Sequence, residues 1–354
     1  MSNVSVIILA AGQGSRMKSA LPKVLHPIAG KALVQHVIDT SYQLNANKII
    51  AVYGHGGNVV PKTNNDDNVT WVVQAEQLGT GHAVKQAMPE VDNKDIALIL
   101  YGDVPLIKAE TLSQLITQAE NNFALLTVHL DDSTGYGRII RNKDGAVECI
   151  VEHKDSSKEE KQITEINTGI LAVNADKLRS WLNQLDNSNA QGEYYLTDVI
   201  AMAVHDGMVI KTVNPESEKE VLGVNSRLQL AELERFYQLS NAQSLMEQGV
   251  TIIDPARLDI RGNVKVGKDV TLDINVILEG NVVIGDNVSI GANCVIKDSA
   301  IGNGVVIQPM CCVEQAQIGA DSKVGPFARI RPGTKLSAET HIGNFVEIKN
   351  SVIG

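Results

Sequence analysis

Hydrophobic residues follow two different patterns along the chain, and the change from one to the other falls near residue 250. In the first part, short apolar runs rich in β-branched residues alternate with stretches of helical periodicity. Such runs are typical of buried strands in a parallel sheet, and their alternation with helices predicts a doubly wound α/β fold. The clearest predicted strands cover residues 4–11, 49–53, 69–74 and 96–101.

Residues 125–150 have the pattern of antiparallel hairpins instead, with turn residues at Gly135, Gly137 and Asp144-Gly145. The predicted sheet is therefore mixed, and we assign residues 1–225 to this first domain. Residues 226–249 predict one linker helix of some six turns. Ser226 and Gln229 have the spacing of a capping box, and Gly249 suits the position after a helix end.

From residue 250 to residue 354 an aliphatic residue recurs every six positions, with two steps of five. This period predicts a stacked β-helix, in which each flat side supplies one inward residue per coil. The last coil has no visible cap and Ile353 begins a new phase, so we expect the sequence to be a truncated or unusually short form. The in-phase residues are Val266, Leu272, Leu278, Ile284, Ile290, Ile296, Ile301, Ile307, Val313, Ile318, Val324, Ile330, Leu336, Ile342 and Ile348.

The composition narrows the class of protein. The formal net charge of the 354 residues is −10 and no Lys/Arg stripe is present, which argues against nucleic-acid binding. No apolar run is long enough to span a bilayer, and the N-terminus does not resemble a signal peptide. The cysteines lack metal-ligand spacing, and we expect free buried thiols and a cytoplasmic protein. They are Cys149, Cys294, Cys311 and Cys312.

A glycine-rich loop follows the first predicted strand and carries two cations, Arg16 and Lys23. Glycines let backbone N–H groups approach anionic oxygens, so the loop predicts phosphate binding. It is not a P-loop, because Met17 stands where the second glycine of that motif belongs. The same residue replaces the third glycine of the dinucleotide-binding motif. The alternative is an ordinary strand-to-helix turn that happens to contain glycines.

Polar residues also follow other predicted strands, at Gln74, Gly79-Thr80 and Gly102-Asp103. Ligands of open α/β sheets bind beyond the carboxyl ends of the strands, so we expect these residues to line one pocket. Asp103 suits a Mg²⁺ ligand that bridges to phosphate oxygens, but a helix cap or turn aspartate is an equal alternative. Glu152, from its spacing alone, belongs to a solvated charged turn. Asn167, between apolar residues, suits recognition of a sugar hydroxyl.

Taken in order, several segments resemble a known family over the whole chain. They are LAAGQGSRM, PKVL, QAEQLGTGHA, YGDVPL, GYGRI, VEHKD, INTGI and GVN, followed by the hexapeptide tail. Together they resemble the bacterial bifunctional N-acetylglucosamine-1-phosphate uridyltransferase / glucosamine-1-phosphate acetyltransferase. The resemblance implies a Rossmann-like nucleotidyltransferase domain with a mixed sheet, and a left-handed parallel β-helix.

The resemblance also implies residue roles. Arg16 would face the leaving diphosphate and Lys23 the nucleotide phosphates, while Asp103 would bind Mg²⁺ with Asn225 as its partner. This decides between the two interpretations of Asp103 and reverses that of Glu152. The nucleotide loop would comprise Leu9, Ala10, Ala11 and Gly12, the uracil site Gln74, Gly79 and Thr80, the lining Tyr101 and Gly102, and the N-acetylglucosamine site Gly137, Glu152 and Asn167.

The implied reaction joins UTP and N-acetylglucosamine 1-phosphate to give UDP-N-acetylglucosamine and diphosphate, for peptidoglycan and lipopolysaccharide precursors. The sugar phosphate is already a nucleophile at neutral pH, so catalysis requires positioning and charge neutralisation rather than a general base. The resemblance further implies a homotrimer. Two alternatives stay open: a related pyrophosphorylase that uses ATP or GTP, and a non-catalytic assembly subunit of similar layout.

The second activity of the family acetylates glucosamine 1-phosphate with acetyl-CoA. Arg331 and Lys349 match the first two residues that bind the substrate phosphate in that reaction. The catalytic histidine and the acetyl-CoA-binding residues would fall after Gly354, and His341 does not correspond to that base. We therefore expect this chain to lack acetyltransferase activity, and acetyl-CoA to be a substrate only of a longer parent protein.

Overall fold

The structure is a computed structural model that describes residues 3–54, 58–64 and 66–354. The chain forms two compact units, of which the first comprises Met1–His26 and Ala32–Leu230. The second comprises Pro27–Lys31 and Ala231–Gly354. The division thus falls inside the linker helix, and a short segment from the N-terminal region is grouped with the second unit.

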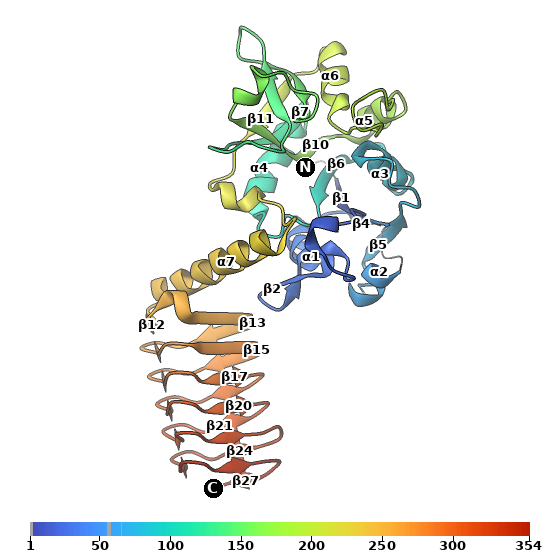
Figure 1. Cartoon of the computed structure of the whole chain (residues 1–354). Helices are drawn as coiled ribbons and strands as arrows, with labels where there is room; N and C mark the ends of the chain where they lie inside the picture. The colour runs from blue at the N-terminus through green and yellow to red at the C-terminus, as the bar shows by residue number, and fades with distance from the viewer. Residues whose placement is uncertain (1–2, 55–57, 65) are drawn as a thin grey trace. The chain divides into compact units, whose positions relative to one another are not determined.

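The first unit is built on a nine-stranded mixed sheet (Figure 1). Its strands β6, β1, β4 and β5 are adjacent in that order and parallel. Strand β10 runs antiparallel to both β6 and β7, so the fold is the mixed α/β type that the sequence predicts. The strands are β1 Val4–Ala10, β4 Lys48–Tyr53, β5 Val69–Val73, β6 Ile96–Tyr101, β7 Phe123–His129, β8 Arg138–Arg141, β9 Val147–Val151, β10 Glu165–Asn174 and β11 Ile210–Val213.

Helices cover both faces of this sheet (Figure 1). Successive side chains of a strand point to opposite faces, so β1 places Ile8 in one core and Ile7 in the other. Helices α1 and α4 contribute to the first core, and α3, α5 and α6 to the second. All of β1 is therefore buried. The helices are α1 Leu33–Gln43, α2 Val59–Asn64, α3 Thr80–Ala87, α4 Ala109–Ala119, α5 Ala175–Leu182 and α6 Asp198–His205.

The glycine loop after β1 is more structured than the sequence predicts. Two 3₁₀ turns, Ser15–Met17 and Lys23–Leu25, lie between β1 and α1. Gly14 has a φ of +62°, and a Cβ added there would stand 2.6 Å from Cβ of Lys23. Only glycine therefore allows the loop to fold back onto Lys23. Short strands β2 Pro27–Ile28 and β3 Lys31–Ala32 follow, and further 3₁₀ turns cover Met88–Glu90, Glu160–Gln162, Glu218–Val221 and Pro255–Arg257.

Helix α7, Arg227–Glu247, is the predicted linker helix, shorter by one residue at its start and two at its end. It ends in a Schellman arrangement at Gly249, in which Val250 N–H donates to the Leu245 carbonyl. Leu230, Leu233, Tyr237 and Leu245, joined by Phe236, recur at helical spacing and predict one apolar face. This prediction is only partly right, because Phe236 is 37% exposed. Gln238 is buried in its place, and its amide exchanges two hydrogen bonds with the backbone of Ile260.

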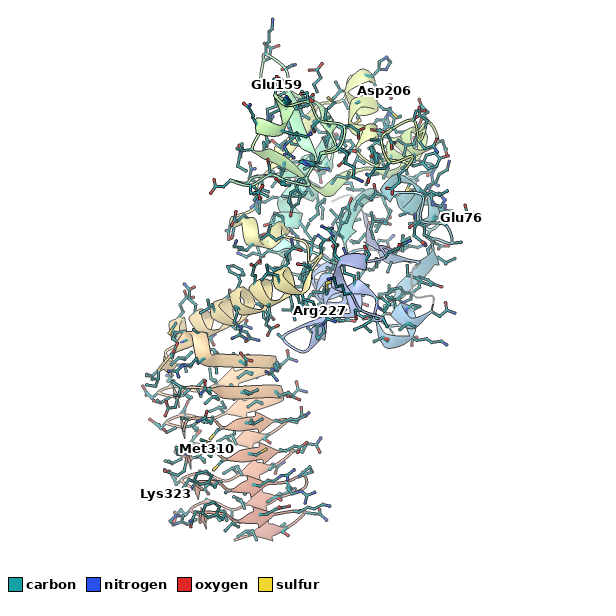
Figure 2. All side chains as sticks on the ribbon, viewed as in Figure 1. Glu76, Glu159, Asp206, Arg227, Met310 and Lys323 are labelled. Atoms are coloured by element: carbon teal, nitrogen blue, oxygen red, sulfur yellow. The ribbon has the colours of Figure 1, made fainter. Side chains whose placement is uncertain are left out.

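The second unit contains a parallel β-helix whose short strands stack in successive coils (Figure 1). Large polar and apolar side chains project outward, among them Met310 and Lys323 (Figure 2). The strands are β12 Thr251–Ile252, β13 Leu258–Val266, β14 Thr271–Leu272, β15 Val276–Ile284, β16 Ser289–Ile290, β17 Val295–Lys297, β18 Ala300–Ile301, β19 Val306–Ile307, β20 Cys312–Glu314, β21 Gln317–Ile318, β22 Lys323–Val324, β23 Arg329–Ile330, β24 Lys335–Leu336, β25 His341–Ile342, β26 Glu347–Ile348 and β27 Val352–Ile353.

The strand register explains the six-residue period. Ile277 pairs with Val295, 18 residues on, so a coil contains three hexapeptides. Val295 pairs with Cys312, only 17 residues on, because that coil contains the step of five between Ile296 and Ile301. The in-phase residues from Leu272 to Ile342 are buried, whereas Val266, Ile348 and Ile353 are half-buried. The prediction of a hexapeptide β-helix is confirmed.

The four cysteines are free thiols, with Cys294 and Cys311 buried and Cys149 and Cys312 half-buried. The expectation of buried thiols thus holds for two of them. Among the described residues, no helix is both long enough and apolar enough to cross a membrane.

Candidate functional site

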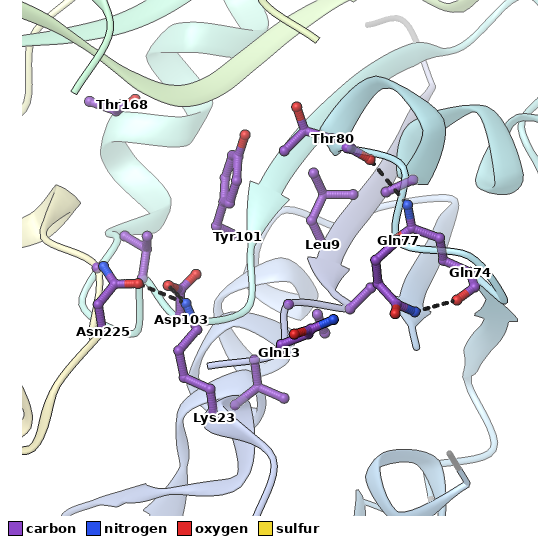
Figure 3. A pocket seen from close by; sticks show the side chains of 18 of the residues that line it. Leu9, Gln13, Lys23, Gln74, Gln77, Thr80, Tyr101, Asp103, Thr168 and Asn225 are labelled. Carbon is purple, nitrogen blue, oxygen red and sulfur yellow. Dashed lines mark hydrogen bonds and ion pairs between the residues drawn. The ribbon is translucent and has the colours of Figure 1, made fainter. Parts of the chain in front are cut away.

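A cavity of about 570 Å³ opens at the carboxyl ends of β1 and β6 in the first unit (Figure 3). Polar residues from loops far apart in the sequence meet there, as expected for an open α/β sheet. Among the residues predicted from the sequence, those that line it are Leu9, Ala10, Ala11, Gly12, Lys23, Gln74, Gly79, Thr80, Tyr101, Asp103 and Asn225. The predicted pocket therefore exists, and the separate motifs converge on it.

Lys23, Asp103 and Asn225 form a polar cluster in this cavity (Figure 3). The Lys23 ammonium donates to Asp103 Oδ2 at 2.5 Å and to Asn225 Oδ1 at 3.0 Å. The backbone N–H of Val224 donates to the Asp103 carbonyl, and this hydrogen bond holds the segment that carries Asn225 beside Asp103. Two acceptor oxygens thus converge on a single ammonium group. Both belong to residues that were predicted to bind a metal cation.

The loop between β5 and α3 presents the predicted base-binding residues. Gly79 has a φ of +108°, and a Cβ there would stand 2.7 Å from the Tyr194 carbonyl oxygen. The loop is held against this segment by hydrogen bonds from Tyr194 N–H to the Leu78 carbonyl and from Gly81 N–H to the Tyr194 carbonyl. The sequence pattern predicts a helix from Ala83 to Met88, but helix α3 starts three residues earlier, because Gly79 turns the chain directly into it.

Gly137, Glu152 and Asn167 lie close together but do not form part of the cavity wall. The Asn167 N–H donates to the Gly137 carbonyl at 2.9 Å, and a Cβ on Gly137 would lie 3.6 Å from Oε1 of Glu152. Burial raises the pKa of Glu152, while a 3.0 Å hydrogen bond from the Thr197 hydroxyl opposes that shift. Glu152 is thus a half-buried carboxylate, and not the solvated turn residue that its spacing alone suggests.

Comparison with known proteins decides the family. The model of a MobA-like NTP transferase domain matches residues 6–251, and that of a GMPPB C-terminal domain matches residues 260–354. The bifunctional protein GlmU of Marinobacter nauticus is 56% identical over all of this chain and 78% of its own length. That of Acinetobacter baylyi is 55% identical over 99% of this chain and 77% of its own length.

The chain belongs to the GlmU family. This confirms the sequence prediction of a nucleotidyltransferase that serves UDP-N-acetylglucosamine synthesis, in a family whose members also have acetyltransferase activity. The two matched regions follow one another along the chain in the same order as the α/β sheet and the β-helix.

Enzymes of the GlmU family use a divalent metal ion, and the polar cluster fits one. The Asp103 carboxylate and the Asn225 amide are hard oxygen donors, which such ions prefer. Within the part of the chain that the structure describes, no three His, Cys, Asp or Glu side chains gather in a metal-binding arrangement.

Besides Gly137, Glu152 and Asn167, two further predicted residues of this GlmU-family site lie outside the cavity wall. Arg16 is exposed on the first 3₁₀ turn. Burial raises the pKa of Tyr136, and the charge of Arg16 opposes that shift. Tyr136 lines the cavity, so the charge of Arg16 lies near its edge. Gly102 is buried, and its N–H donates to the Leu9 carbonyl at 2.9 Å, so its role is to turn the chain toward Asp103.

Sequence reasoning missed several residues of the cavity wall. Eight of them fall within segments on which the family resemblance rests, namely Gln13, Val24, Gln77, Ala83, Val104, Tyr136, Thr168 and Gly223. Their position in those segments was the available signal. The remaining missed residues carry no signal in the sequence, because tertiary packing alone brings them to the cavity. They are Glu193 and Val221.

The residues predicted for acetyl transfer lie in the β-helix. Arg331 donates to Oε1 of Glu347 at 2.6 Å, across two stacked coils, and Lys349 is exposed. The assignment of these two side chains to a substrate phosphate stays a prediction.

Proposed function

We propose that this cavity binds UTP and N-acetylglucosamine 1-phosphate together and catalyses Mg²⁺-dependent uridyl transfer between them. The observation that supports this most strongly is the convergence of Asp103 and Asn225 oxygens on the Lys23 ammonium, beside the glycine loop. Such a cluster suits a nucleotide whose phosphates need both a metal ion and a fixed positive charge.

The chemical step needs no general base. An oxygen of the sugar phosphate attacks the α-phosphorus of UTP, a new P–O bond forms, and diphosphate leaves with the electron pair of the broken bond. Asp103 and Asn225 would hold Mg²⁺, which supplies charge neutralisation on the phosphate oxygens when bound. Lys23 would add positive charge beside the nucleotide phosphates, and Arg16 would do so for the departing diphosphate.

The remaining residues would position the two substrates. The Gln74–Thr80 loop would hold uracil, and the glycine loop from Leu9 to Gly12 would approach the nucleotide closely. The group of Gly137, Glu152 and Asn167 would bind the sugar. Glu152 would accept hydrogen bonds from sugar hydroxyls, and it lies close enough to Tyr101 to raise the pKa of that residue in addition to burial.

The test is diphosphate release measured with Mg²⁺, each of the four nucleoside triphosphates and a set of sugar 1-phosphates. We expect turnover with UTP and N-acetylglucosamine 1-phosphate to exceed that of every other pair. Preference for ATP or GTP would favour a related pyrophosphorylase, and no turnover with any pair would favour a non-catalytic assembly subunit.

The assembly and location follow the family resemblance. We propose a homotrimer, which light scattering on the purified chain would test, with a monomeric mass as the contrary result. We also propose a cytoplasmic location, where UTP is available.

A further inference from the structure

The side-chain amide of Gln74 is held by two contacts on one of its ends. Its nitrogen, Nε2, donates to the Gly79 carbonyl at 3.1 Å and lies 3.1 Å from Nδ1 of His82. A carbonyl oxygen can only accept, so the contact with Gly79 identifies this end as the nitrogen. The residue is only 3% exposed, and it lines the cavity. Within the described part of the chain, its oxygen Oε1 has no hydrogen-bond partner.

These contacts fix the protonation of His82. Both hydrogens of the Gln74 amide are used by Gly79 and His82, so Nδ1 of His82 must accept and carries no proton. The proton is then on Nε2, which faces the Gln86 side-chain amide at 3.1 Å. A half-turn of that amide presents its oxygen to the Nε2–H group. The ring also lies beside Tyr194, with 6.4 Å between ring centroids.

We propose that His82 is a positioning residue that keeps the Gln74 oxygen directed into the cavity and thereby favours uracil over cytosine. The inference rests on the proposed function, in which the loop of Gln74 binds the base. Uracil carries a hydrogen on N3 that Oε1 of Gln74 can accept. Cytosine has a lone pair at the same position and would face Oε1 without a hydrogen between them.

The argument depends on the cost of turning the Gln74 amide over. Cytosine binding is improved by a half-turn that presents Nε2 to its N3. In the native protein that half-turn would direct Oε1 at two acceptors, the Gly79 carbonyl and Nδ1 of His82. Each contact between two acceptors in a buried site loses a hydrogen bond and adds repulsion. Without His82, only the Gly79 carbonyl opposes the half-turn.

Two substitutions at position 82 separate this role from simple packing. In His82→Asn the amide oxygen can occupy the place of Nδ1 and accept from Gln74. In His82→Gln the amide reaches the place of Nε2, toward Gln86, and leaves no acceptor for Gln74. Both variants are polar, uncharged and smaller than histidine, so a purely structural effect would appear in both.

The measurement is kcat/KM for UTP and for CTP, with N-acetylglucosamine 1-phosphate saturating. We expect His82→Gln to lower the UTP to CTP ratio about tenfold, mainly through a higher KM for UTP, because one buried hydrogen bond is lost. We expect His82→Asn to keep the ratio within about twofold of the native value. The KM for the sugar phosphate should stay the same in both variants.

A second measurement does not depend on either variant folding. The ¹⁵N chemical shifts of the His82 ring in the native protein should show an unprotonated Nδ1 and a protonated Nε2. A proton on Nδ1 would overturn the proposal, as would an unchanged ratio in His82→Gln. If the native chain does not use UTP at all, the proposed function fails and this inference fails with it. Native turnover with an unchanged ratio rejects His82 alone.

Discussion

At the scale of single residues, the cluster of Lys23, Asp103 and Asn225 predicts the largest loss of activity. Asp103→Asn keeps the size of the side chain and removes the charge that pairs with Lys23 and would hold Mg²⁺. We expect kcat for diphosphate release to fall by about 10²-fold or more at saturating Mg²⁺, which is the usual effect of removing one electrostatic group from such a site. The matched control is Asp144→Asn, at an exposed hairpin turn. Activity of Asp103→Asn within a few-fold of the control would reject the assignment.

Replacement of Glu152 by glutamine should have opposite effects on activity and on stability. Its pKa is raised in the folded state by burial, so the folded chain binds this proton more tightly than the unfolded chain does. The contribution of this group to the stability of the folded state is then lost as pH rises from the ordinary glutamate pKa through the raised one. At pH 7, above the ordinary glutamate pKa, the raised pKa of Glu152 destabilises the folded state, and Glu152→Gln should raise Tm. It should also raise KM for the sugar phosphate about tenfold, through weaker hydrogen bonds to sugar hydroxyls.

The control for Glu152 is a glutamate with the opposite shift. Hydrogen bonds from Ser157 lower the pKa of Glu160, which is half-buried. Glu160→Gln should therefore leave Tm unchanged or lower it slightly at pH 7. Thermal unfolding at pH 7 and near pH 4.5 checks both variants, and the gain from Glu152→Gln should shrink at the lower pH. A gain that does not change with pH would show that ionisation of Glu152 is not its cause.

Residue roles could be predicted only where a residue type is unusual for its place. A buried aspartate after an apolar strand and two cations in a glycine loop attract attention in the sequence, and Asp103 and Lys23 do meet in the structure. Glu193 and Val221 also line the cavity, but nothing in their local sequence differs from ordinary loop or helix residues. Such residues reach the site through the packing of distant segments, which one sequence does not display.

At the scale of elements, the base-binding loop depends on glycine at position 79. Gly79→Ala would place a Cβ 2.7 Å from the Tyr194 carbonyl, at a φ that L-residues rarely adopt. The loop would have to separate from the segment at Tyr194, so we expect KM for UTP to rise by about tenfold or more and Tm to fall. The control is Gly145→Ala, where φ is +81° and nothing lies within 4 Å. That variant should lose about 1 kcal/mol of stability from backbone strain and keep its KM. Equal effects of the two variants on KM would contradict the role of the close contact.

The sequence located strands better than it located turns and helix faces. Apolar runs identify β1 and β6 to within one residue, because a strand covered on both faces has no polar positions. The 3₁₀ turns before α1 escaped prediction, since they depend on the folding of Gly14 against Lys23. On α7 the pattern failed where Gln238 is buried, because its hydrogen bonds to Ile260 replace an apolar contact.

At the scale of the whole molecule, the six-residue period was the most reliable signal. It repeats over many coils, so a few irregular positions do not obscure it, and the two steps of five appear as 17-residue coils. The α/β unit has no such repetition. Its turn residues predicted only the hairpins of residues 125–150, and the antiparallel strand β10 between β6 and β7 was not predicted. Periodicity could not indicate the substrates, and only the family resemblance predicted them.

The two units have separate hydrophobic cores, and this predicts how the chain unfolds. The β-helix core draws its buried residues from positions 242 to 342, and each coil buries its inward face on its neighbours. Val313 is fully buried there, whereas Val283 is 50% exposed on the outside. Val313→Ala should therefore cost about 2 kcal/mol through lost burial and a residual cavity, and Val283→Ala should cost much less.

Fluorescence and circular dichroism can assign that loss to one unit. Both tryptophans, Trp71 and Trp181, belong to the first unit, so their emission reports its unfolding alone. Far-ultraviolet circular dichroism reports the strands of both units. In Val313→Ala the circular dichroism transition in urea should acquire an earlier phase, while tryptophan emission and diphosphate release keep the native midpoint and rate. A shift of the tryptophan transition by the same amount would mean that the two cores unfold as one cooperative unit, despite being built from separate stretches of the chain.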